Sequence, residues 1–86
     1  EYHMVKTKIE QSPDIDLQRI FAALSEKYRN EQVNTEDGLK IDFDSGWVHL
    51  RPSNTEPIIR IYSESTSTVI AENLARKIMQ DIQALR

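Results

Sequence analysis

Hydrogen-bond donors and positively charged side chains are concentrated in one stretch of the chain, from Arg51 to Arg60. The guanidinium groups at its ends are planar donors that can hold an oxyanion through charge-assisted, often bidentate hydrogen bonds. Hydroxyl, amide and loop backbone N–H groups lie between them, and such N–H groups can form an anion-binding nest. Prolines stiffen the stretch, so less entropy is lost when a ligand binds. The donors and prolines between the arginines are Pro52, Ser53, Asn54, Thr55 and Pro57. These residue types predict a site for a phosphate-like anion.

Alternating apolar and polar residues on both sides of this stretch predict two strands joined by a loop over 52–57. If the apolar residues face the core, Arg51 and Arg60 both project from the opposite face of the sheet, here called the open face. In an antiparallel pair the two arginines could then converge on one ligand. The apolar positions are Val48 and Leu50 before the loop and Ile59 and Ile61 after it.

Each charge-assisted hydrogen bond contributes roughly 1.5–3 kcal/mol. Two or three of them, after entropy losses, would give about millimolar affinity. That affinity is weak for a stand-alone receptor and reasonable for one wall of a larger site. An arginine-bearing loop on a soluble protein is often only a solvated turn, and the residue types alone leave this alternative open.

Other polar residues near the loop have simpler interpretations. We expect Glu56 to form an ion pair with Arg60 or Arg51, His49 to be a surface strand residue, and Trp47 to pack at the sheet edge. Ser53 is not interpreted as a nucleophile, because no activating base is apparent in the pattern. We find no cluster with the spacing of metal ligands.

The remaining elements are those that must position this loop. An alternating strand and a helix with apolar residues at helical spacing precede it, and a helix with a continuous apolar stripe follows it. Ser12-Pro13-Asp14 has the residue types of a helix start, and Asp37-Gly38 those of a turn. The expected elements are a strand over 3–10, a helix over 14–29, short extended pieces before a strand over 39–43, the two strands around the loop (the second over 58–63), and a helix over 67–85. The expected stripe of the last helix is Ile70, Ala71, Leu74, Ala75, Ile78, Met79 and Ile82. This order predicts an α+β two-layer domain, with both helices on one face of an antiparallel sheet.

Length, net charge and composition limit the classes of protein to which this chain can belong. The 86 residues suffice for one domain with one modest core. A net charge of −3 argues against a nucleic-acid binder. The absence of cysteine excludes disulfides and thiolate chemistry and fits a reducing cytoplasm. No apolar run approaches the roughly 18 residues needed to cross a membrane. Because the chain starts at Glu1, we expect it to be a fragment of a longer protein.

The stretch from Gly46 to Pro57, followed by Arg60, strongly resembles the phosphate-binding loop of the α-D-phosphohexomutases. This family includes phosphomannomutase, phosphoglucomutase and phosphoglucosamine mutase. The resemblance covers essentially all residues 1–86 and implies a single domain, the C-terminal phosphate-binding domain of a four-domain mutase. The implied fold is like that of the TATA-box-binding protein, with the order β-α-β-β-β-β-α.

The resemblance also implies a role for each matching residue. Arg51, Ser53, Asn54 and Thr55 would hold the phosphate that is not transferred, and Arg60 would support them. Further supporting positions are Glu56, Pro52 and His49. Asn54, where some family members have glycine, favours the mannose and glucose branch over the glucosamine branch.

The implied reaction interconverts hexose 1-phosphate and 6-phosphate through a phosphoserine enzyme and a bisphosphorylated sugar. The family's phosphoserine, magnesium and sugar-recognition loops have no counterpart in this sequence. We therefore expect the fragment alone to be inactive, with Mg²⁺ bound by other domains of the same chain in a cytoplasmic parent enzyme. The expected partners are those domains and a mannose, glucose or glucosamine phosphate, without nucleic acid or membrane.

A second hypothesis is a stand-alone α+β module that binds RNA or protein and has no mutase activity. It would use the open face, with Trp47, Tyr62, Lys6 and Lys8.

Overall fold

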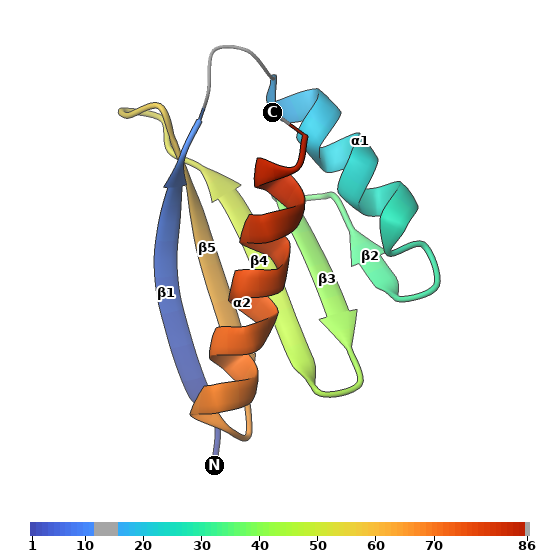
Figure 1. Cartoon of the computed structure of the whole chain (residues 1–86), viewed down its shortest axis with the longest axis vertical. Coiled ribbons are helices and arrows are strands. Elements are labelled where there is room, and N and C mark those ends of the chain that lie inside the picture. The colour runs from blue at the N-terminus through green and yellow to red at the C-terminus, as the bar shows by residue number, and fades with distance from the viewer. Residues whose placement is uncertain (12–15, 86) are drawn as a thin grey trace.

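A computed structural model describes residues 1–11 and 16–85 of the chain. It contains two helices and five strands in the order β-α-β-β-β-β-α, as predicted (Figure 1). The elements are β1 (His3–Glu10), α1 (Leu17–Lys27), β2 (Gln32–Asn34), β3 (Leu39–Phe43), β4 (Gly46–Pro52), β5 (Ile58–Ser65) and α2 (Thr68–Gln83).

The strands form one antiparallel sheet in the order β1-β5-β4-β3-β2. Both helices cover the same face, with α2 packed over β1, β5 and β4 (Figure 1). The first strand of the chain therefore lies beside β5, the last strand. The connection between β4 and β5 projects at the end of the sheet where β1 finishes. This arrangement confirms the predicted two-layer α+β fold and leaves the second face of the sheet open.

Both helices begin at a polar cap. The Asp16 carboxylate accepts a hydrogen bond from the Arg19 backbone N–H at 2.7 Å, and Ser67 Oγ accepts one from the Ile70 N–H at 3.4 Å. These caps satisfy N–H groups that lack a partner within the helix. Within the described residues α1 is shorter than predicted, running from Leu17 to Lys27. The helix-start signal at 12–14 lies outside the described residues.

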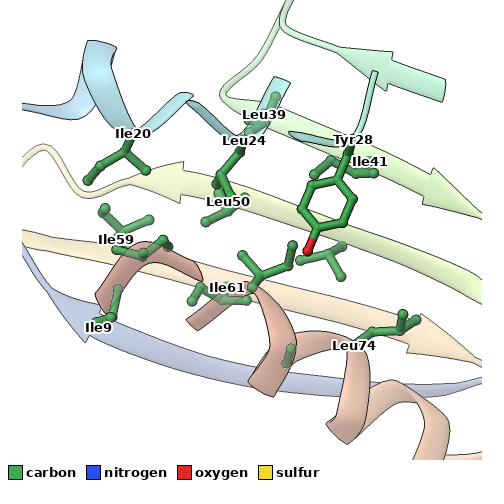
Figure 2. Close-up of a cluster of buried hydrophobic side chains, with 14 residues drawn as sticks. Ile9, Ile20, Leu24, Tyr28, Leu39, Ile41, Leu50, Ile59, Ile61 and Leu74 are labelled. Atoms are coloured by element: carbon green, nitrogen blue, oxygen red, sulfur yellow. The ribbon is translucent and has the colours of Figure 1, made fainter. Parts of the chain in front are cut away.

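The core lies between the sheet and the two helices, as Figure 2 shows. Tyr28 is part of this core, and its hydroxyl donates a hydrogen bond to Asp81 of α2. Burial, together with this acidic partner, raises the pKa of Tyr28 above its ordinary value. The side chains at the centre of the core are Leu24, Leu39, Ile41, Val48, Leu50, Ile59, Ile61, Ile78 and Ile82.

Three details differ from the sequence-based expectations. Ile70 was expected in the apolar stripe of α2 but lies in the first turn with 37% of its surface exposed. Trp47 was expected at the sheet edge, but β4 is the central strand and Trp47 lies near its start, away from the β4–β5 loop. Ile58 lies two residues before Arg60, so strand alternation places it on the open face, but its side chain is buried.

Two buried serines on β5 should change the stability of the protein in opposite directions when each is replaced by alanine. Ser63 Oγ is buried without a hydrogen-bond partner among the described residues, whereas Ser65 Oγ donates to the Ser45 carbonyl at 2.6 Å. Because an unpaired buried hydroxyl is unfavourable, Ser63→Ala should raise the free energy of unfolding by about 1 kcal/mol. Ser65→Ala should lower it by about 1 kcal/mol. Urea denaturation of the two variants checks both signs, and a destabilised Ser63→Ala would contradict this interpretation.

Candidate anion-binding site

The register of β4 and β5 places Arg51 directly opposite Arg60. The neighbouring residues Leu50 and Ile61 are fully buried beneath the helices, so both guanidinium groups project from the open face. Their side chains are about half exposed, with relative accessibilities of 52% and 47%. The structure confirms the prediction that the two arginines project from the same face.

Like charges placed opposite each other on a sheet repel, and two carboxylates offset this repulsion. Arg51 Nη2 lies 3.5 Å from Asp37 Oδ2, and Arg60 Nη2 lies 4.0 Å from Glu56 Oε1. The Glu56 ion pair is one of the two predicted from the sequence. Both pairs are solvent-exposed, and exposed pairs of this kind contribute little. An anion of higher charge can therefore take the place of either carboxylate.

The turn that carries Asp37 is held against β4 by a glycine. Gly38 has φ +70°, and a Cβ atom there would lie 2.2 Å from the Leu50 carbonyl oxygen. This close approach brings the Asp37 carbonyl within 2.6 Å of His49 Nε2. His49 therefore has a partner in the turn, and the turn sets the positions of both His49 and the carboxylate beside Arg51.

The loop itself, Ser53–Pro57, is organised around the Ser53 side chain. Ser53 Oγ accepts hydrogen bonds from the N–H groups of Thr55 and Glu56, both at 3.3 Å. The Ser53 N–H donates to the Ile58 carbonyl at 3.1 Å, which closes the base of the loop. The Pro57 carbonyl accepts from Gln11 at 2.8 Å, which ties the loop to the end of β1. Pro52 was expected in the loop but is the last residue of β4, opposite Ile59.

Asn54 lies at the tip of this loop. No hydrogen-bond partner is found for its side chain or its backbone N–H among residues 1–11 and 16–85. Its donors are thus available to a ligand. The Ser53 hydroxyl lies 3.4 Å from Thr55 Oγ1, so one of these two hydroxyls can give its hydrogen to an external acceptor.

Five of the predicted binding and supporting residues line one hollow of about 250 Å³ on the open face. Thr55 belongs to the loop but does not line the hollow, and neither does Glu56. Tyr62 does, although the sequence analysis named it only for the alternative RNA- or protein-binding module. Strand parity places it on the open face, because Tyr62 lies two residues after Arg60. The complete lining is Arg51, Pro52, Ser53, Asn54, Arg60 and Tyr62.

A second hollow of about 390 Å³ adjoins the first on the open face, and the two share Arg60 and Tyr62. It is lined by Lys6, Thr7, Lys8, Arg60 and Tyr62. Within the described ranges no group of three histidine, aspartate or glutamate side chains is placed to hold a metal ion. The residues that line the two hollows offer hydrogen-bond donors and positive charge.

The fold and the paired arginines define a two-layer α+β domain with two arginines side by side on its open face. Over residues 4–81 the chain matches the family model of the phosphoglucomutase/phosphomannomutase C-terminal domain. The chain belongs to this family. Family membership favours the mutase interpretation over that of an unrelated RNA- or protein-binding module.

Relatives with curated names agree with this assignment. A phosphoglucosamine/phosphogalactosamine mutase of Sulfurisphaera tokodaii is 34% identical over 85 residues, which cover 96% of this chain and 19% of that protein. A phosphoglucomutase/phosphomannomutase of Thermococcus kodakarensis is 44% identical over 69 residues, covering 78% of the chain and 15% of the relative. The chain thus spans a fifth or less of the length of these relatives. In the described part of the chain, no helix has both the length and the apolar character needed to cross a membrane.

Proposed function

We propose that this chain is the domain of a phosphohexomutase that binds the substrate's non-transferred phosphate. The observation that carries the proposal is the cross-strand pair of Arg51 and Arg60 beside a loop with unoccupied donors. The longer protein would interconvert hexose 1-phosphate and 6-phosphate through a phosphoserine and a bisphosphorylated sugar. The isolated domain supplies binding and no catalytic group.

Each side chain has a distinct part in this role. The guanidinium groups of Arg51 and Arg60 donate charge-assisted hydrogen bonds to the phosphate oxygens. Asn54 and one hydroxyl of the Ser53–Thr55 pair add neutral donors. His49 and Glu56 act indirectly. His49 contacts the turn that carries Asp37, and Glu56 is the ion-pair partner that the ligand replaces at Arg60.

A reaction that exchanges the two ends of a sugar requires the same site to accept the substrate in two orientations. The donors in the smaller hollow suit this requirement, because they would recognise phosphate oxygens and not the sugar ring. Binding to this wall alone would be about millimolar. The remaining affinity and the transferring serine would come from other domains. Mg²⁺ would be bound there too, and it would stabilise the negative charge on the transferred phosphoryl group.

The preferred sugar is proposed from the relatives' names. One relative is named for glucosamine and galactosamine phosphates and another for glucose and mannose phosphates. Further relatives are named phosphoglucosamine mutases, including one of Methanococcus aeolicus that is 44% identical over 46 residues (54% of the chain and 10% of the relative). These names favour glucosamine phosphate over the glucose or mannose phosphate suggested by Asn54.

An NMR titration of the 86-residue chain tests the proposal. Glucose 1-phosphate and inorganic phosphate should both shift the amide signals of residues 51–60, with about millimolar midpoints. Glucose, which lacks the phosphate, is the matched control and should leave these signals unchanged. Equal small shifts over the whole surface, or a response to glucose as large as that to its phosphate, would contradict the proposal.

A further inference from the structure

The open face carries a row of three cations on three adjacent strands. Lys8 of β1 is opposite Arg60 of β5, and Arg60 is opposite Arg51 of β4. Neighbouring strands lie about 4.8 Å apart, so the whole row spans roughly 10 Å at the backbone. A single phosphate ester placed beside Arg60 would be attracted electrostatically by all three cations.

Within residues 1–11 and 16–85, Lys8 differs from the arginines in having no carboxylate partner. Arg51 and Arg60 are paired with Asp37 and Glu56, whereas no ion pair of Lys8 is found within the described residues. Its side chain lines the larger hollow together with Arg60, and Arg60 also lines the smaller one. The two carboxylates balance two of the three charges, so the row keeps one unneutralised cation.

An unneutralised cation opposite a second cation is unfavourable in the free protein. Binding of a dianion would remove this repulsion and turn the charge of Lys8 into an attraction. Sequence order alone does not reveal the row, because it depends on β1 pairing with β5. Lys8 was therefore not among the predicted phosphate-site residues and was named only for the alternative binding module.

We propose that Lys8 is a third cation of the phosphate site, acting on the ligand from β1. This inference rests on the proposed function of the arginine pair and adds a residue to it. Lys8 contributes by charge and not by a fixed hydrogen bond, because its ammonium group is a flexible point charge. Its loss should therefore weaken phosphate binding without weakening the fold.

The test is calorimetry of Lys8→Met and Lys40→Met with glucose 1-phosphate at low ionic strength. Both substitutions remove one positive charge from the open face, but Lys40 lies on β3, outside the row, with its Nζ 3.9 Å from Asp42 Oδ1. Lys8→Met should lower the affinity about two- to fivefold, and Lys40→Met by less than about half that factor. The urea midpoint of Lys8→Met should be equal to or above that of the wild type. Lys8→Arg, which keeps the charge, should restore the affinity.

Equal losses in the Lys8→Met and Lys40→Met variants would overturn the inference, because only net charge would then matter. So would a lower urea midpoint for both Lys8→Met and Lys8→Gln, which would assign Lys8 a structural role. If Arg51→Ala abolishes binding while Lys8→Met does not weaken it, only the inference fails. If Arg51→Ala also retains full affinity, the proposed function fails with it.

Discussion

Replacing Arg51 with alanine should lower the affinity for glucose 1-phosphate by at least about tenfold, because each charge-assisted hydrogen bond contributes about 1.5–3 kcal/mol. The substitution also removes one of the two guanidinium groups that face each other across β4 and β5. The fold should remain intact, since Arg51 is half exposed and its ion pair with Asp37 is a surface pair. Isothermal calorimetry measures the affinity, and urea denaturation checks the fold.

Arg29 provides the matched control for this loss. It is also an exposed arginine in a surface ion pair, with Glu26 at 2.9 Å, but it lies just beyond the end of α1 and far from the loop in sequence. Arg29→Ala should therefore leave phosphate affinity unchanged. Arg51→Lys should show an intermediate loss, because lysine keeps the charge but not the planar fork. Wild-type affinity in the Arg51→Ala variant would count against the site.

Gly38→Ala should lower the free energy of unfolding by about 2–4 kcal/mol. The left-handed φ of +70° is unfavourable for alanine, and its Cβ would lie 2.2 Å from the Leu50 carbonyl oxygen. The turn or β4 must then move. Since small domains are stabilised by only about 5–15 kcal/mol in total, this loss is a large share. Urea denaturation gives the free energy directly.

The Gly38→Ala substitution should also disturb the candidate anion-binding site. The turn sets the Asp37 carboxylate 3.5 Å from Arg51 and the Asp37 carbonyl 2.6 Å from His49, so its displacement changes the surroundings of both side chains. Thr35→Ala, an exposed substitution just before this turn, should change stability by less than about 0.5 kcal/mol. A Gly38→Ala variant as stable as the Thr35→Ala variant would show that the turn is not held against β4.

Local periodicity was enough to predict much of the site. Alternation around the loop identified the buried faces of β4 and β5, and from those faces the common direction of Arg51 and Arg60 followed. The helices were predictable for the same reason, because their apolar residues recur at helical spacing. These features depend only on residues close to one another in the chain.

Contacts between distant segments were not predictable in this way. The alignment of Lys8 with Arg60 depends on the pairing of the first and last strands, and the Asp37–Arg51 ion pair depends on how closely the turn approaches β4. Trp47 was misplaced for the same reason, because sequence order does not show that β4 is the central strand. Tyr62 is a different case, since its parity was available and only its contribution to the hollow was missed.

A crystal structure of the chain with glucose 1-phosphate would show directly where the phosphate binds. We expect one phosphate group within hydrogen-bond distance of both the Arg51 and the Arg60 guanidinium groups, with at least one donor from residues 53–55 completing its contacts. A phosphate bound elsewhere, or one held by a single arginine while the other keeps its carboxylate, would contradict it.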